Sequence, residues 1–533
     1  MDLMDFLFHY LKWTHKLMLK ILNLISNNYF LKQKLSVPTL NSPVRRLTDT
    51  WQGISKQGKE IIEKKLTAKK ISNFNEFLFL RDLRSEGTLK ARSIARSLVI
   101  NWIDEKHNLL SKEFKADIMS SRVSVWSFSY SWFAESGELY FQKKLLNSIS
   151  LQTKYLELKL EETNDSLEKI IIIKGIIIGK SILYETIKGI DNLIELIDIE
   201  LMSLINADGG HISRSPVLQI QLLRHLIEIR SVIAILKNIN TEQLHKKALK
   251  MGEFCRGFQM PNDYFAWFHG GSLISKDLIK QTLDRIGYKN KIFEIAEETG
   301  FYRMSNIDTV VFMDIGVIQN LKHKNKASLF AFEFYFQKQK IISSLGELIN
   351  SNSINAKASL ASSAAHSTLS IDDRNNIDLT GNRKTKILNL EYGKTKQGNL
   401  IDIKHSGYEL IYGVHHRRQI YLSKNKGEIR GHDEILNIEN VGSIPKNADI
   451  RFHLHPEIDL IKVRNGSILL KHKKGFIWKM ITDSQNVTTH DSIMFFPSGS
   501  IPCKQIIISV NLDEIRVKKS ISCNWAFQLQ NKI

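Results

Sequence analysis

The spacing of the apolar residues changes once along this chain, and that change is the strongest constraint on its fold. Over residues 55–289 apolar side chains recur every three or four positions, which predicts amphipathic helices. After Phe301 the apolar segments are short, rich in β-branched and aromatic residues, and often alternate with polar ones, which predicts strands. A chain of 533 residues is also too long for one ordinary core. We therefore expect a multidomain α+β protein, helical first and β-rich afterwards.

Turn signals divide both halves into regular pieces. Asp208-Gly209-Gly210 ends one predicted helix, and Ser215-Pro216 gives the next helix an N-cap acceptor and a first-turn proline. Consecutive helices with short connections predict stacked hairpins or an α/α toroid-like domain over residues 55–297. Turns such as Asn465-Gly466 separate the later strands, as in an antiparallel β-sandwich, which we place at residues 298–533.

A basic N-terminal segment, residues 1–54, precedes the helical domain. Its first thirty residues are apolar but carry scattered charges, and they lack the uninterrupted apolar core and cleavage site of a secretory signal. An amphipathic helix in peripheral contact with a membrane surface would suit this segment. A helix packed on the first domain suits it equally well.

The formal net charge of +20 favours a polyanionic partner, such as nucleic acid, anionic lipid or acidic polysaccharide. The alternative is a composition bias that spreads positive charge over a solvated surface, because the basic residues form no long tail. No helix-turn-helix, zinc-finger or RNA-recognition signature accompanies the charge. We therefore expect no nucleic-acid partner.

The three cysteines, Cys255, Cys503 and Cys523, are far apart and form no CxxC pair. They support neither a disulfide framework nor a zinc ribbon. A bridge between Cys503 and Cys523 stays open if their strands are neighbours, but free buried thiols are the favoured interpretation.

The most distinctive motif spans residues 364–373. A small-small-His turn, Ala364-Ala365-His366, leads into an alternating strand that ends in Asp372-Asp373. With other blocks, in the same order along residues 75–530, this motif resembles the heparinase II/III-like polysaccharide lyases. The other blocks are Leu80-Arg81-Asp82-Leu83-Arg84 and residues 208–216, 416–422, 430–433, 451–456 and 524–527.

The resemblance implies a helical toroid followed by a β-sandwich, and cleavage of acidic, uronate-containing polysaccharides by β-elimination. Such a reaction needs a base for the proton next to the uronate carboxylate, a group that neutralises this carboxylate, and an acid for the departing oxygen. We therefore expect an acidic polysaccharide as partner. The resemblance also implies a cell envelope or periplasmic location, while the lack of a clear signal segment keeps a cytoplasmic one open.

Three residues are candidates for catalysis. Tyr302, at the start of the sandwich domain, is the candidate base, with a half-buried aromatic at a domain junction as the alternative reading. His211 precedes a helix N-terminus, a place suited to an anion, although it could equally cap that helix. His366 is the third candidate, and a structural hydrogen bond to the backbone would explain it as well.

The candidates for substrate binding are mostly cationic or aromatic. Arg214 could hold a uronate carboxylate together with His211. The loop at Trp267 and His269 suits stacking on sugar rings, and a packed inter-domain loop is the alternative. The remaining candidates are Arg303, beside Tyr302, and His416 and Arg418, which alternate along a strand that could instead be a solvated face.

The resemblance also implies a structural metal, bound by a sandwich histidine, an aspartate and His366. Here Lys324 and Lys326 stand where imidazoles are expected, and Ser344 or Gly346 stands where the aspartate is expected. Because a divalent ion needs three or four protein ligands, we expect no metal and no other cofactor. His323 is the one nearby residue that could substitute for a ligand after a local shift.

The helical half departs from the family as well, because Val217-Leu218-Gln219 replaces the expected Tyr-His pair. Fold does not fix function. The alternative to a lyase is therefore a catalytically divergent relative that binds acidic glycan in the inter-domain cleft without cleaving it.

Overall fold

The computed structural model describes residues 41–533 apart from 65, 106–111, 237–238, 288–291, 318–325, 349–352, 426, 440–441, 464–465 and 532–533. The first forty residues of the predicted N-terminal segment therefore lie outside the described residues. Contacts divide the chain into two compact units. The helical unit is residues 1–203 and 224–246, and the sandwich unit is residues 204–223 and 247–533.

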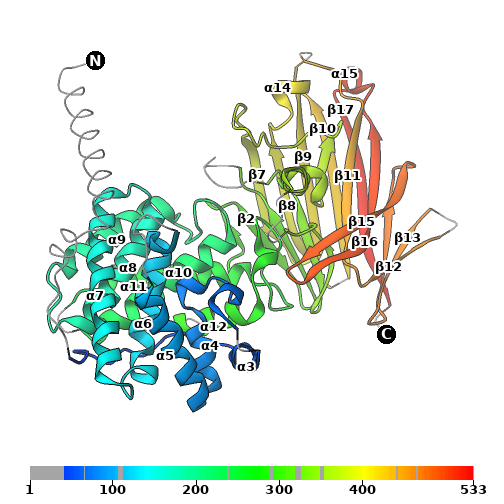
Figure 1. Ribbon diagram of the computed structural model, residues 1–533. Helices are drawn as coiled ribbons and strands as arrows, with labels where there is room; N and C mark the ends of the chain where they lie inside the picture. Colours follow the sequence, from blue (N-terminus) through cyan, green and yellow to red (C-terminus); the bar gives the residue numbers. More distant parts are fainter. Residues whose placement is uncertain are drawn as a thin grey trace, which may run out of the picture. The chain divides into compact units, whose positions relative to one another are not determined.

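The helical unit is built from helices that follow one another with short connections (Figure 1). Side-chain caps start two of these helices: Thr88 accepts the backbone N–H of Ala91, and Asp165 that of Glu168. Its helices are α3 (Ser55–Glu63), α4 (Phe79–Glu86), α5 (Leu89–Asp104), α6 (Ala116–Phe133), α7 (Leu139–Glu162) and α8 (Ser166–Leu183), with most of α9 (Ile190–Leu204) and the second part of α10 (Pro216–Ile233).

Helix α8 is buried along most of its length, as its run of isoleucines predicts. Lys174, which interrupts that run, forms an ion pair with Glu228 at 3.1 Å, and Glu228 also pairs with Arg81 at 2.8 Å. Paired charges of this kind let a lysine lie inside an apolar helix. Within the described residues, no helix combines the length and the apolar character needed to cross a bilayer.

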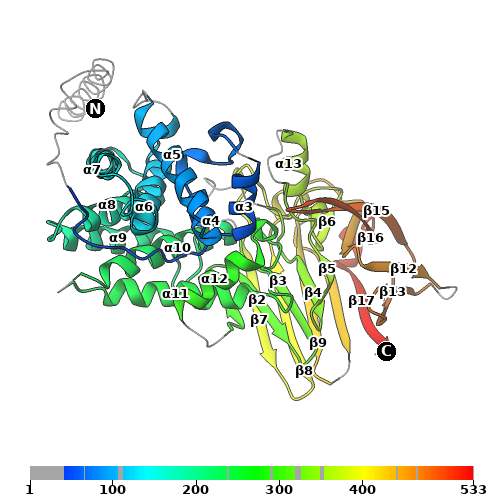
Figure 2. The same cartoon turned by 60° about the horizontal axis from the view of Figure 1, so that its bottom comes forward.

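The sandwich unit contains two antiparallel sheets (Figures 1 and 2). The first has the strand order β1-β2-β3-β4-β5-β11-β16-β15, with β6 paired to β11, and the second has the order β12-β13-β14-β17-β10-β9-β8-β7. The strands are β1 (Ile295–Ala296), β2 (Phe301–Ser305), β3 (Thr309–Asp314), β4 (Phe332–Phe336), β5 (Gln339–Ser343), β6 (Leu369–Ile371), β7 (Ile387–Lys394), β8 (Gly398–His405), β9 (Val414–Ser423), β10 (Glu428–Asn437), β11 (Asn447–Leu454), β12 (Ile458–Lys462), β13 (Ile468–His472), β14 (Ile477–Thr482), β15 (Val487–Phe496), β16 (Gly499–Asn511) and β17 (Ser520–Asn531).

The core of the sandwich unit is formed by apolar side chains from both sheets. Phe332 of β4 stacks on Trp525 of β17 with ring centroids 5.5 Å apart, and Phe334 meets Phe527 at 6.2 Å. Cys503 and Cys523 lie in strands of different sheets, and both are free and buried. The order of helices and sheets confirms the predicted α+β class.

The compact units do not follow the change from helices to strands, which falls between α12 (Lys276–Ile286) and β1. Residues 204–223, 247–258 of α11 (Glu242–Phe258), and α12 belong to the sandwich unit. Asp208 accepts the backbone N–H of Thr299 at 2.7 Å, and Arg214 donates to the carbonyls of Thr299 at 2.7 Å and Gly300 at 3.0 Å. The Asp-Gly-Gly block thus anchors its own segment to the first strands.

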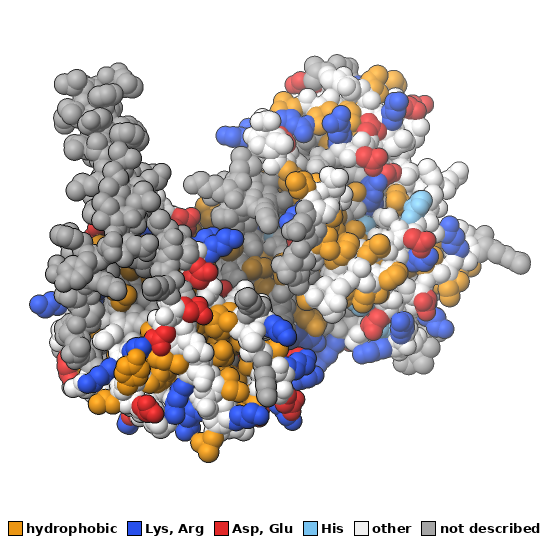
Figure 3. Space-filling view, in the orientation of Figure 1, with side chains coloured by type: hydrophobic (Ala, Val, Ile, Leu, Met, Phe, Trp, Pro, Cys, Tyr) orange, Lys and Arg blue, Asp and Glu red, His pale blue; other side chains and the backbone are white. Residues whose placement is uncertain are grey.

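Charged side chains of both signs are interspersed on the face displayed in Figure 3. Lys and Arg exceed Asp and Glu by 75 to 55 in the whole sequence, yet the blue side chains on this face do not gather in one patch.

Candidate active site

His366 lies between η5 (Ser363–Ala365) and β6, where the distinctive motif begins. The residue is 3% exposed, and its Nδ1 lies 2.9 Å from Oγ of Ser344. Its Nε2 has no hydrogen-bond partner among the residues that the structure describes. Burial, and then the nearby positive charge of Lys326, hold the pKa of His366 well below its usual range. The imidazole is therefore neutral near pH 7, with one nitrogen uncommitted.

His269 lies in the loop between α11 and η4 (Gly271–Leu273), with a backbone φ of 48° that a non-glycine residue adopts at an energetic cost. Its Nε2 lies 2.9 Å from Oδ2 of Asp314, the last residue of β3. Because an ionised carboxylate only accepts hydrogen bonds, Nε2 carries the proton and Nδ1 keeps its lone pair. This Nδ1 is buried and, within the described part of the chain, has no partner. A carboxylate that orients an imidazole in this way is a recurrent feature of general bases.

Asp314 is held ionised by the groups around it. Its Oδ2 accepts the hydroxyl of Ser328 at 2.6 Å as well as the His269 ring, and its Oδ1 pairs with Arg214. Burial alone would raise the pKa of Asp314, but the Arg214 guanidinium and the bonds from His269 and Ser328 lower it far below its usual range. Burial and then Arg214 in turn lower the pKa of His269. The pair is therefore a neutral imidazole on a carboxylate.

His453 of β11, like His269, has one bonded and one unbonded ring nitrogen. Its Nε2 lies 2.9 Å from the carbonyl oxygen of Ala364 and must donate, so its buried Nδ1 keeps a lone pair, which no described residue meets. Burial lowers the pKa of His453 to about 4. His453 also donates its backbone N–H to Ser367 Oγ at 3.0 Å, beside His366, and positive charge on His269 or on His453 would lower the pKa of His366 further. We call His269, His366 and His453 the histidine cluster.

The metal site implied by the resemblance does not fit the residues found here. The Lys326 ammonium forms an ion pair with Glu347 at 2.7 Å, and Ser344 contributes a hydroxyl to His366. An ammonium has no lone pair for a cation, so His366 is the one good metal ligand of this set. Within the described residues, no three His, Cys, Asp or Glu side chains are grouped to hold a metal ion. His323 and Lys324 lie outside the described residues.

Three other predicted residues contact the protein elsewhere in the sandwich unit. His211 accepts the backbone N–H of Ser213 at 3.1 Å through Nδ1. Arg303 donates to two backbone carbonyl groups at the end of α11, at 3.0 and 2.9 Å. The ring of Trp267 lies 3.9 Å from the Lys340 ammonium. The substrate-related roles of His211, Arg303 and Trp267 remain predictions.

Tyr302 lies in the core between the two sheets. Its hydroxyl has no hydrogen-bond partner among the described residues. Burial raises the pKa of Tyr302, because a phenolate would be poorly solvated there. Its role as the base stays a prediction.

His416 and Arg418 belong to a second buried network. His405 Nδ1 accepts the backbone N–H of Gly407 at 2.9 Å, so its Nε2 carries the proton toward His416 Nδ1 at 3.1 Å. His416 Nε2 then donates to Asp433 at 2.7 Å, and Arg418 donates to the same carboxylate at 2.7 Å. We call His405, His416 and Asp433 the histidine relay. Since its ring nitrogens all have partners, the substrate-binding roles predicted for His416 and Arg418 stay without structural support.

The sequence reasoning did not single out Asp314, Ser328 or Asp433. A carboxylate directly after an apolar strand was the available signal for Asp314. Asp433 stands in a block, residues 430–433, whose only signal is the family resemblance. Ser328 gave no usable signal, because a lone hydroxyl beside a strand is common.

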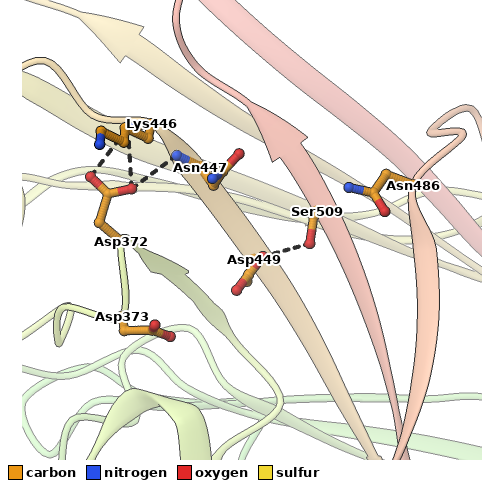
Figure 4. A pocket seen from close by; sticks show the side chains of 7 residues that line it. All are labelled: Asp372, Asp373, Lys446, Asn447, Asp449, Asn486 and Ser509. Carbon is orange, nitrogen blue, oxygen red and sulfur yellow. Dashed lines mark hydrogen bonds between the residues drawn. The ribbon is translucent and has the colours of Figure 1, made fainter.

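A pocket of about 620 Å³ lies at the other end of the motif, beyond β6 (Figure 4). The Asp372 carboxylate accepts the backbone N–H of Asn447 at 2.9 Å, and Asp449 accepts the hydroxyl of Ser509 at 2.7 Å. Asp373 pairs with Arg451 at 3.2 Å. The residues that line the pocket are Asp372, Asp373, Lys446, Asn447, Asp449, Asn486 and Ser509. Its carboxylates are already bonded within the protein, so we assign it no ligand.

Comparison with known proteins agrees with this architecture. Residues 289–526 match the model of the heparinase II/III-like C-terminal family. A crystal structure of heparinase III superposes with a TM-score of 0.68 at 13% identity, covering 95% of this chain and 89% of that one. Heparan sulfate lyase HepC from Pedobacter heparinus superposes with a TM-score of 0.64 at 12% identity, covering 94% and 87%. At such identities these structures establish the fold, a helical toroid followed by a β-sandwich.

A curated relative is FtsZ-localized protein C from Caulobacter vibrioides, with 24% identity over 359 residues. The match covers 63% of this chain, and the chain spans 61% of that relative's length. The matched residues include strands β1 to β16. They also include His366 and His453 of the histidine cluster and the whole histidine relay. Residues 289–526 therefore form a heparinase II/III-like C-terminal domain, in a chain that has the fold of the heparinase III structures.

Proposed function

We propose that this protein is a polysaccharide lyase that cleaves an acidic, uronate-containing glycan by β-elimination. The observation that carries the proposal is the His269–Asp314 pair, a neutral imidazole with a fixed tautomer and an unbonded, buried Nδ1. The net charge of +20 supports an acidic substrate. The family supports a glycan as the substrate class.

In the proposed reaction, the proton on the carbon next to the uronate carboxylate moves to Nδ1 of His269 as that C–H bond breaks. The electron pair forms a carbon–carbon double bond, and the bond to the departing glycosidic oxygen breaks. The imidazolium then gives the proton to that oxygen, so one side chain acts as base and acid. Asp314 stabilises the imidazolium between the two steps. Since His269 is 6% exposed, the neighbouring side chains must shift to admit the sugar.

The test is the ultraviolet absorbance of unsaturated uronate product on a panel of acidic polysaccharides, including heparan sulfate, chondroitin sulfate, hyaluronate and alginate. We expect product from the unaltered protein and a loss of roughly 10²–10⁴-fold in kcat for His269→Gln. His490→Gln, at an exposed histidine, is the matched control and should keep full activity. Absence of product on every glycan would contradict the lyase proposal, and an active His269→Gln variant would contradict the assignment of the base.

A second candidate is a family member that binds acidic glycan without cleaving it. Lys326 and Ser344 favour this candidate, because they stand where the resemblance implies two metal ligands and neither side chain suits that role. Under this candidate, immobilised heparan sulfate retains the protein but no product forms on any glycan of the panel. We place either function in the cell envelope, where acidic polysaccharide occurs, and fractionation of cells would test that location.

A further inference from the structure

Three segments of the sandwich unit meet beside His366. They carry Lys326, before β4, Ser344, after β5, and His366, before β6. Backbone and hydroxyl bonds tie the segments together: Ala327 N–H to the Ala361 carbonyl at 2.8 Å, Leu345 N–H to the Ala365 carbonyl at 3.0 Å, and Ser367 Oγ to the Ser343 carbonyl at 2.7 Å. The three positions named by the resemblance as metal ligands therefore do lie together, although their side chains are not a metal-binding set.

A positive charge is nevertheless present at this point. Lys326 is 6% exposed, and its ammonium pairs with Glu347 at 2.7 Å and donates to the Leu360 carbonyl at 3.3 Å. Leu360 belongs to α13 (Ile354–Ala361), and Glu347 follows β5. One ammonium thus connects the segment before β4 to the segment after β5 and to α13. A metal ion bound at the three expected positions would likewise connect the segment before β4 to the segment after β5, with His366 as its third contact in place of α13.

We propose that the Lys326 ammonium has taken over the structural role of a divalent cation, so that this sandwich is held together without a metal. The buried ammonium neutralises the Glu347 carboxylate and, through Glu347 and the Leu360 carbonyl, orders its own segment, the segment after β5 and α13. The Ser344 hydroxyl, 2.9 Å from Nδ1, orients the His366 ring at a position where the resemblance implies a metal-binding carboxylate. This inference does not depend on lyase activity, because it concerns the stability of the unit.

The first test uses the purified full-length protein. We expect no stoichiometric divalent metal by elemental analysis after purification without chelator. We also expect the same Tm with and without EDTA. A bound metal in a 1:1 ratio, or a Tm that falls by several degrees in EDTA, would overturn the proposal.

The second test removes the charge. Lys326→Met keeps the length of the side chain but leaves the Glu347 carboxylate without its ammonium, and we expect Tm to fall by several degrees. Lys326→Arg keeps the charge and is the matched control, with a smaller loss. Adding Glu347→Gln to Lys326→Met should recover part of the loss. If Lys326→Met is as stable as the unaltered protein, the ammonium has no structural role.

The third test restores a metal-binding set. Lys326→His combined with Ser344→Asp would place two imidazoles and a carboxylate around one point. We expect this double variant to bind one zinc ion by isothermal titration and to gain Tm when zinc is added. The unaltered protein and Lys326→His alone should respond far less. A folded double variant that binds no zinc would show that the three positions do not converge as proposed. If the double variant fails to fold, the EDTA and Lys326→Met measurements still decide.

Discussion

The histidine relay and the histidine cluster are both buried in the sandwich unit, yet they use their ring nitrogens in opposite ways. In the relay, each nitrogen of His405 and His416 has a partner, and the chain of bonds ends on Asp433 and Arg418. In the cluster, each of the three rings has one bonded nitrogen and one that meets no described residue. A buried polar atom without a partner costs free energy, and such atoms concentrate where function requires them. The relay is thus explained by the fold alone, whereas the cluster is not.

The largest change in stability is expected for a substitution that breaks the histidine relay. Asp433→Asn removes the charge that Arg418 and His416 share, and it also weakens the bond from Trp525 Nε1 at 2.8 Å. Because the Arg418 charge is then left buried without its counter-charge, we expect the free energy of unfolding to fall by about 3–5 kcal/mol in urea denaturation. Asp491→Asn, at an exposed ion pair, should change it by less than about 1 kcal/mol. Equal stabilities for the two variants would remove the distinction between relay and surface.

The second prediction concerns the stability of the protein at acidic pH. The folded pKa of His453 is lowered to about 4, so between the unfolded value near 6.5 and about 4 the unfolded chain binds a proton that the folded protein does not. Stability is therefore complete above about pH 6.5, and this one group lowers it by about 1.4 kcal/mol per pH unit as the pH falls. Denaturation midpoints measured from pH 7.5 to 4 check the slope. His453→Gln should make the slope shallower, and an unchanged slope would contradict the burial of a neutral imidazole.

The third prediction compares the loss of stability when one histidine of the relay and one of the cluster are replaced. His416→Gln interrupts a bond on each ring nitrogen, and we expect a loss of roughly 2–3 kcal/mol in the free energy of unfolding. His269→Gln loses the single bond to Asp314, so about 1 kcal/mol is expected. Urea denaturation of the two proteins compares them directly. A larger loss for His269→Gln would show that the cluster is the more structural of the two.

The smallest effect is expected for Ser344→Ala. This change removes the 2.9 Å hydrogen bond to Nδ1 of His366 and leaves a second nitrogen of that ring without a partner. We expect a loss of about 1 kcal/mol, measured as a shift of the urea midpoint at constant m-value. Ser500→Ala, at an exposed position on β16, is a matched control with no expected change. No shift for Ser344→Ala would place the His366 ring in a different orientation from the one described.

The sequence predicted the architecture well because periodicity reports burial one element at a time. The isoleucine run of α8 and the alternating strands of residues 301–531 show their burial in the spacing of their own residues. The histidine cluster could not be predicted in this way, since its rings come from positions 269, 366 and 453 and only the fold brings them together. Arg214 illustrates the difference. It was expected to hold a substrate carboxylate, and the structure shows it against a protein carboxylate, Asp314.

The attachment of residues 204–223 to the strands also limits how such a gene can be recombined. Arg214 donates to Thr299, Gly300 and Gly316 and pairs with Asp314, so it supplies the counter-charge for a carboxylate encoded a hundred residues downstream. A crossover placed at the change from helices to strands would separate the two, leaving Asp314 buried without its cation. The segment that must be kept together in recombination is therefore longer than the strands alone. It begins upstream of the Asp208-Gly209-Gly210 turn, inside what reads as the helical half.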